Sequence, residues 1–153
     1  MFEHLKRLFS GEGFSSSTSE GDGEGPQLAA AALLVEAGLM DGTLDADEER
    51  TILALLQDHF SLSLEEANSI LAAAKEKVDH SVELYSFAKQ VKEGYPPERR
   101  VEVIEMLWEV VYADGVVHDY EANLVRRVAG LIYVSDRDSG DARKRVTARL
   151  GIT

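Results

Sequence analysis

Apolar residues recur at helical spacing along most of the chain, and this regularity constrains the fold more than any other feature. One stripe consists of Ile52, Leu55, Leu56 and Phe60, and similar stripes follow one another between residues 28 and 153. No segment alternates with period two for long, which weighs against strands. The connections are short, so consecutive helices should pack antiparallel. We therefore predict an all-α fold, a compact bundle of about seven helices.

The first 27 residues differ in composition from the rest. Residues 10–27 contain five Gly, five Ser and four acidic residues, which is typical of a flexible acidic linker. Residues 1–9 form a short amphipathic segment that needs a surface to fold on, either its own domain, a partner or a membrane. The predicted organisation is this segment, the linker, and a helical domain over residues 28–153.

The charge and the motifs present exclude several classes of protein. The chain has 16 Lys and Arg against 28 Asp and Glu, a net charge of −12, so it does not bind nucleic acid through phosphates. It has no cysteine, which excludes disulfides and thiolate metal sites. It shows no phosphate-binding loop, serine elbow or zincin motif, so we do not expect an enzyme. No apolar run approaches the ~20 residues of a membrane span, and we expect a cytoplasmic protein, with a membrane-peripheral role left open through residues 1–9.

A duplication is the most informative motif. Residues 33–49 read LLVEAGLMDGTLDADEE, and residues 106–122 read MLWEVVYADGVVHDYEA, at an offset of 73 residues without a gap. Each copy is predicted to be a helix, a tight loop and a second helix, which suggests a pseudo-twofold domain. Across the two copies, Asp41 matches Asp114 and Glu48 matches Glu121. Glu36 likewise matches Glu109.

Each loop has a local physical explanation. Glycine follows the aspartate in both copies, and a left-handed helix end favours glycine. Asp45 can cap the next helix while Glu48, three residues on, reaches back to its amide in a capping box. His118 takes the place of Asp45 in the second copy and is a weaker cap. The acids can therefore be explained by helix capping alone.

The loops also match the second half of an EF-hand calcium loop, with glycine at position six and glutamate at position twelve. The first half does not match. Positions one and three are Ala37 and Leu39 in the first copy, and Val110 and Tyr112 in the second. These side chains supply no carboxylate, so ordinary EF-hand calcium binding is not expected.

The duplicated loop resembles the tellurite-resistance protein B (TerB-like) family. The resemblance rests on Tyr112-Ala-Asp-Gly-Val-Val117 followed by Glu121, and on the weaker copy Met40-Asp-Gly-Thr-Leu-Asp-Ala-Asp-Glu-Glu49. It covers roughly residues 28–150. The N-terminal domains of some membrane-anchored DnaJ-type co-chaperones share this superfamily.

The resemblance implies a bundle of about seven helices and a role in tellurite resistance or a wider metal and chemical stress response. It also implies protein partners, at the inner membrane face. Divalent-cation binding by the acidic loops is a further implication, with calcium, magnesium or zinc as the ion. The implied ligands are Asp41, Asp45, Glu48, Asp114 and Glu121.

Other features leave alternatives open. The acids could serve capping alone, in a metal-independent scaffold or co-chaperone-like interaction domain. Trp108 shares a stripe with core residues and is expected inside, whereas Tyr112 and Tyr120 could form an exposed partner surface. The bases at Arg143–Arg145 and Arg149 are either a solvated helix face or dock against the acidic loops.

Overall fold

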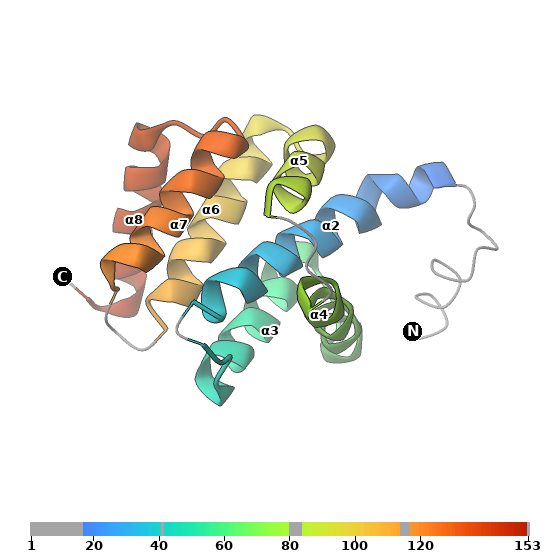
Figure 1. The fold of residues 1–153 in the computed structure, drawn as a ribbon, viewed down its shortest axis with the longest axis horizontal. Coiled ribbons are helices and arrows are strands. Elements are labelled where there is room, and N and C mark those ends of the chain that lie inside the picture. Colours follow the sequence, from blue (N-terminus) through green and yellow to red (C-terminus); the bar gives the residue numbers. More distant parts are fainter. Residues whose placement is uncertain (1–16, 41, 80–83, 114–116, 153) are drawn as a thin grey trace.

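The structure is a computed structural model that describes residues 17–40, 42–79, 84–113 and 117–152, with side chains from residue 25 onward. All regular secondary structure in these residues is helical (Figure 1), which confirms the predicted all-α bundle. The seven helices described are α2 (Ser17–Gly38), α3 (Ala46–Phe60), α4 (Leu64–Asp79), α5 (Leu84–Gly94), α6 (Pro97–Val111), α7 (Asp119–Leu131) and α8 (Asp136–Leu150).

Helix α2 lies at the centre of the bundle and packs against α3, α4, α5 and α6. The sequence pattern suggested a stripe on one face, but the helix is buried on all sides from Leu28 to Val35. The four alanines at 29–32 are no more than 1% exposed. A helix that is apolar all round belongs in an interior, and small side chains let several neighbours approach it closely.

The outer helices bury the stripes that the sequence predicted. The stripe of α3 from Ile52 to Phe60 is buried, as is Trp108 of α6. Helix α6 packs against α7 and α8, and α5 bridges α2 and α7. The core is therefore continuous through α2 and α6.

Three helices begin with residues that are typical of a helix start. Glu66 donates its backbone N–H to Ser63 Oγ (3.0 Å), and the Ser63 N–H donates to Glu66 Oε1 (2.9 Å), a complete capping box for α4. Ser135 Oγ accepts the Asp138 N–H at 3.1 Å at the start of α8. Pro97 is the first residue of α6, as expected for proline.

The end of the segment that composition indicated as linker is helical in the structure. Helix α2 begins at Ser17, inside the segment 10–27 that composition indicated as linker. Pro26 is buried and lies against α5, where a Cβ added to Gly94 would sit 2.6 Å from Pro26 Cγ. The end of the acidic segment therefore packs into the bundle. Composition does not reveal this contact, because it joins residues 68 positions apart.

The two copies of the repeat show matching burial. Leu34 and Leu107 are fully buried, Glu36 and Glu109 are half-buried, and Glu48 and Glu121 are buried. Leu44 and Val117 both pack against the core. The pattern of side-chain burial thus repeats locally, while a twofold relation between the halves stays a prediction.

Candidate functional site

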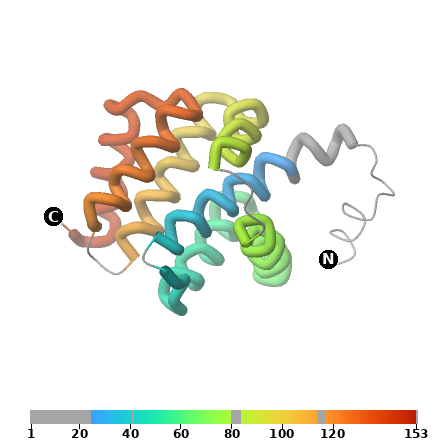
Figure 2. Tube along the Cα trace, in the orientation of Figure 1, coloured from blue at the N-terminus to red at the C-terminus, as the bar shows by residue number. Residues whose placement is uncertain are grey.

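The helix ends that flank the two acidic loops lie at the same end of the bundle (Figure 2). The first two turns of α3 face the last turns of α6 across an open pocket of about 320 Å³. The sequence predicted two separate loops, and the fold places the helices beside them next to each other. The residues lining this pocket are Asp47, Arg50, Thr51, Ala54, Glu109 and Ala113.

The first loop ends in the predicted capping box. Asp45 Oδ1 accepts the Glu48 N–H at 2.8 Å, and Glu48 Oε1 accepts the Asp45 N–H at 3.0 Å. Asp45 is exposed, whereas Glu48 is 7% exposed. Gly42 has a φ of 109°, a conformation that glycine adopts far more readily than other residues. Gly38 lies close to this loop, and a Cβ there would lie 2.3 Å from Leu44 Cδ1, so the Leu44 side chain would have to shift.

The second loop repeats half of this arrangement. His118 is the residue that precedes α7, and its N–H donates to Glu121 Oε1 at 3.0 Å. Glu121 is 5% exposed, and its carboxylate occupies the same capping position as that of Glu48. The His118 ring stacks on Tyr120, with centroids 5.4 Å apart. Both buried glutamates therefore stabilise the start of a helix that follows an Asp-Gly pair in the sequence.

The predicted ligands divide into two groups. Asp41 and Asp114 lie outside the described residues, while Asp45, Glu48 and Glu121 each make the capping bonds given above. Within the described ranges no three acidic or histidine side chains gather closely enough to hold a metal ion. The ligand set that the family resemblance implies stays a prediction.

Other acids around the first loop are paired with bases. Asp47 pairs with Arg50 on the exposed side of α3, and Glu49 of α3 pairs with Lys75 of α4. Exposed pairs of this kind contribute little to stability and are easily exchanged for other partners. This surface is therefore open to competition from a cation or a basic partner.

Glu36 is a residue of the repeat that sequence reasoning matched but did not assign to the site. It is half-buried on α2, and burial raises the pKa of its carboxyl above the ordinary value. It makes no hydrogen bond or ion pair with another residue that the structure describes. A nearby positive charge would stabilise the ionised form of this half-buried carboxyl group. Its match to Glu109 in the repeat was the signal that marked it.

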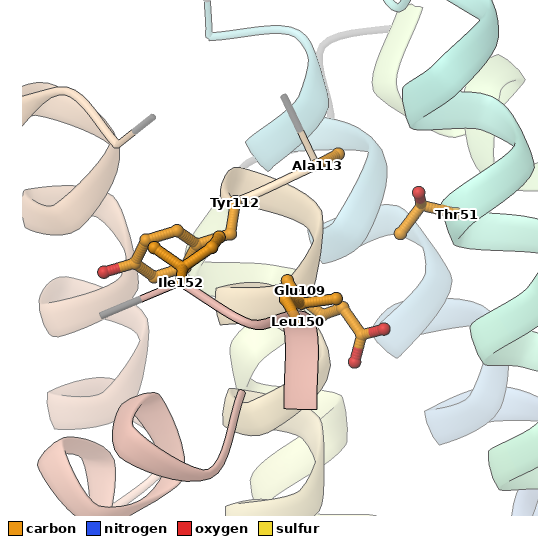
Figure 3. A pocket seen from close by; sticks show the side chains of 6 residues that line it. All are labelled: Thr51, Glu109, Tyr112, Ala113, Leu150 and Ile152. Carbon is orange, nitrogen blue, oxygen red and sulfur yellow. The ribbon is translucent and has the colours of Figure 1, made fainter. Parts of the chain in front are cut away.

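A second pocket opens between α6, the end of α8 and α3 (Figure 3), and it measures about 290 Å³. Glu109 and Thr51 supply its polar groups, from α6 and α3 respectively. The remaining lining is mostly apolar. A wall of this kind suits a side chain with an apolar stem and a basic head. The full lining is Thr51, Glu109, Tyr112, Ala113, Leu150 and Ile152.

The prediction for the two tyrosines is half confirmed. Tyr120 is 44% exposed, but Tyr112 is 9% exposed and therefore not part of an open partner surface. Its hydroxyl accepts a hydrogen bond from Arg143 Nε at 2.8 Å, and the Arg143 guanidinium lies 4.6 Å from the Trp108 ring centroid. The arginine of α8 covers Tyr112, which local sequence could not reveal.

The basic residues of α8 do dock within the chain, but on α6 rather than on the loops. Arg145 Nε lies 3.0 Å from Glu105 Oε1, and Arg149 reaches both Glu105 (2.8 Å) and Glu109 (2.8 Å). These pairs raise the pKa of the Arg149 guanidinium. The Glu109 carboxylate thus belongs both to the pocket and to the contact with α8.

A polar cluster also occupies the opposite end of α3 and α6. Arg99 donates to Glu102 Oε1 (2.7 Å) and to the His59 carbonyl (2.8 Å), and Glu102 also contacts His59 Nδ1. Burial alone would raise the pKa of Glu102, but the bonds from His59 and Arg99 lower it below the ordinary value. Burial raises the pKa of Tyr95 to about 12. These groups satisfy one another and join α3 to α6.

None of the helices in the described part of the chain combines the length and the apolar character needed to cross a bilayer.

Comparison with known proteins agrees with this arrangement. No curated protein matches the chain. Among solved structures, a protein of unknown function from Porphyromonas gingivalis W83 is similar, with a TM-score of 0.59 and 17% identity, over 80% of this chain and 96% of that one. This likeness concerns the fold alone. The family model of tellurite resistance protein TerB matches residues 27–144, which include both loops and the helices around them. The chain therefore belongs to the TerB family of tellurite resistance proteins.

Proposed function

We propose that this protein is a non-enzymatic interaction module of a tellurite-resistance or wider metal and chemical stress response. It acts in the cytoplasm, at the inner membrane face. It acts through the end of the bundle where α3 and α7 begin, with Glu48 and Glu121, which we call the acidic end. The observation that carries the proposal is that the start of α3, which follows the first loop, and the end of α6, which precedes the second, line one pair of pockets together. The family membership supports the stress-response role.

The acidic end is proposed to bind a divalent cation that modulates partner binding. Two capped helix starts that follow an Asp-Gly pair in the sequence each hold a buried glutamate, and Glu36 adds a half-buried carboxylate. All the acidic ligands offer oxygen, which suits calcium or magnesium. His118, beside Glu121, would also permit zinc.

A thermal-shift titration with calcium, magnesium, manganese and zinc tests the cation. A ligand present at 100 times its Kd stabilises the fold by ~2.7 kcal/mol, and a rise of several degrees in Tm is expected. The variant Asp41→Asn with Asp114→Asn should lose the rise. These replacements change charge and keep side-chain shape, and they leave the capping residues Asp45, Glu48 and Glu121 unchanged.

The matched control is Asp136→Asn with Asp138→Asn. It removes the same charge from the start of α8, where Asp138 lies near Pro97 at the other end of α6. The control should keep the full metal response. An absent response at millimolar metal, or an equal loss in both double variants, would refute cation binding at the loops.

A metal-independent scaffold is the second candidate, and a specific observation favours it. Asp45, Glu48 and Glu121 are engaged in caps, and Asp47 and Glu49 are paired with bases. If the protein is such a scaffold, a pull-down should recover the same membrane or chaperone proteins with and without chelator. Recovery that requires added metal would contradict the scaffold and support the cation-dependent module.

The membrane-peripheral placement has its own test. Co-sedimentation with anionic phospholipid vesicles is expected for the full chain and should be lost on deletion of residues 1–9. The deletion leaves Pro26 and its contact with α5 intact. Equal sedimentation of both forms would show that residues 1–9 do not anchor the protein.

A further inference from the structure

Helix α8 is held on the bundle by polar contacts and by a few small buried side chains. Its buried side chains are Ser139, Ala142 and Val146, all small. The Trp108 indole N–H of α6 donates to Ser139, at 3.1 Å to the carbonyl oxygen and 3.2 Å to Oγ. A helix with so little apolar surface can leave its place without exposing a large apolar face of its own.

The α6 surface beneath it is acidic and complementary to it. Glu105 binds Arg145 and Arg149 at once, and Glu109 takes the second nitrogen of Arg149. The side chain of Glu105 is 14% exposed and that of Glu109 is 21% exposed. This surface fits a basic helix with small residues on its inner face, and its occupant in the monomer is α8.

The connection that returns α8 onto α6 is strained. The chain turns between α7 and α8 through Tyr133, whose φ is 61°, the left-handed region that glycine normally fills at this position. The turn is closed by hydrogen bonds from the Tyr133 N–H to the Gly130 carbonyl (3.3 Å) and from the Val134 N–H to the Ala129 carbonyl (2.8 Å). Tyr133 is also 74% exposed. A large residue is therefore held in an unfavourable backbone conformation at a hinge.

We propose that α8 is exchanged between two copies of this chain, so that α8 of each copy occupies the α6 surface of the other. The contacts of α8 are the same in both states. Opening the hinge releases the left-handed conformation of Tyr133 in each copy, and strained short connections favour such exchange. Helix α8 is the last helix described, so it can leave without drawing another described helix with it.

Charge-reversed variants test the exchange directly. In the acceptor variant the charge of the α6 surface is reversed by Glu105→Arg with Glu109→Arg. In the donor variant the charge of α8 is reversed by Arg145→Glu with Arg149→Glu. In each alone, α8 and α6 repel. When the two are unfolded and refolded together, exchange restores both sets of ion pairs. We expect a one-to-one heterodimer of twice the 16.8 kDa chain mass by light scattering.

The control carries all four replacements in one chain, which restores the pairs internally, and it should stay at the oligomeric state of the unmodified protein. Absence of a heterodimer from helical donor and acceptor variants would overturn the proposal. One cysteine can also be placed on α6 and one on the facing side of α8. In an exchanged heterodimer the disulfide should join the two chains, and a disulfide within one chain would overturn the proposal.

The unmodified chain supplies a second test that needs no charge reversal. Refolding at high protein concentration should give some dimer. Tyr133→Gly should lower the dimerisation constant at least ~30-fold, because glycine removes the strain of both hinges in the closed form. A wild-type chain that stays monomeric at every concentration, or a Tyr133→Gly variant that dimerises equally, would refute the exchange.

Discussion

Replacement of Gly94 by alanine tests whether the segment around Pro26 is part of the folded domain. Composition assigned Pro26 to a linker, whereas the structure buries it against the end of α5. A Cβ at position 94 would lie 2.6 Å from Pro26 Cγ and 2.7 Å from Pro26 Cβ. Carbon atoms in ordinary contact are ~3.5–4.0 Å apart, so the overlap is close to 1 Å.

The proline ring is rigid, and the overlap must move a helix or the chain before it. Overpacking of this kind costs about 1–3 kcal/mol. Alanine favours a helix over glycine by up to ~1 kcal/mol, which acts in the opposite direction. We therefore expect a net loss of about 1–2 kcal/mol in the free energy of unfolding, and a Tm lower by roughly 5 °C.

Urea unfolding of a double-mutant cycle measures the contact. Gly94→Ala should be costly in the wild-type background and nearly neutral or stabilising together with Pro26→Gly, because glycine lacks both the Cβ and the Cγ that the new methyl group would meet. Equal costs in both backgrounds would refute the contact. Deletion of residues 1–16 serves as a control and should leave stability unchanged within ~0.5 kcal/mol.

Three further predictions concern polar groups. Glu121→Ala should cost about 1 kcal/mol in urea unfolding by removing the acceptor for the His118 N–H, whereas Glu121→Gln keeps an oxygen there and should cost less than half as much. The stability difference between the wild type and Glu102→Gln should stay constant from neutral pH down to the ordinary carboxyl value of 4.5. It should then shrink as the pH falls through the lowered pKa of Glu102, because protonation ends the advantage of its ionised form. In an absorbance titration, one tyrosine should ionise near pH 12, and Tyr95→Phe should remove that step. Equal costs for Glu121→Gln and Glu121→Ala would contradict the role of the Glu121 oxygen as acceptor. A stability difference between the wild type and Glu102→Gln that does not change with pH would contradict the lowered pKa of Glu102. A tyrosine that still ionises near pH 12 in Tyr95→Phe would contradict the assignment of that step to Tyr95.

The candidate site shows how far local sequence reasoning can reach. The capping box of Asp45 and Glu48 was predicted from residues three positions apart, and its two bonds are present. The bond from Glu121 to the His118 amide follows from the same spacing. The repeat also pointed to Glu36 through its match with Glu109, although only the structure shows that the Glu36 carboxyl is half-buried with a raised pKa.

The errors have a common cause. Exposure of Tyr112 was one of the alternatives that the sequence left open, but Arg143, 31 residues later, covers it. Pro26 was expected in a linker, but it packs against Gly94 at the end of α5. The bases of α8 were expected to dock on the loops if they docked at all, but they bind Glu105 and Glu109. Each depends on a contact between distant parts of the chain.

The sequence by itself determined which segments are helical, where several of them begin, and that two loops share one plan. These properties depend on residues within about four positions of each other, where periodicity and capping act. The tertiary structure decided that α2 is buried on all sides, that the helices beside both loops meet at one end, and that α8 lies on α6 through a strained turn at Tyr133. Packing decides such matters because the neighbours of each residue are set by the whole fold.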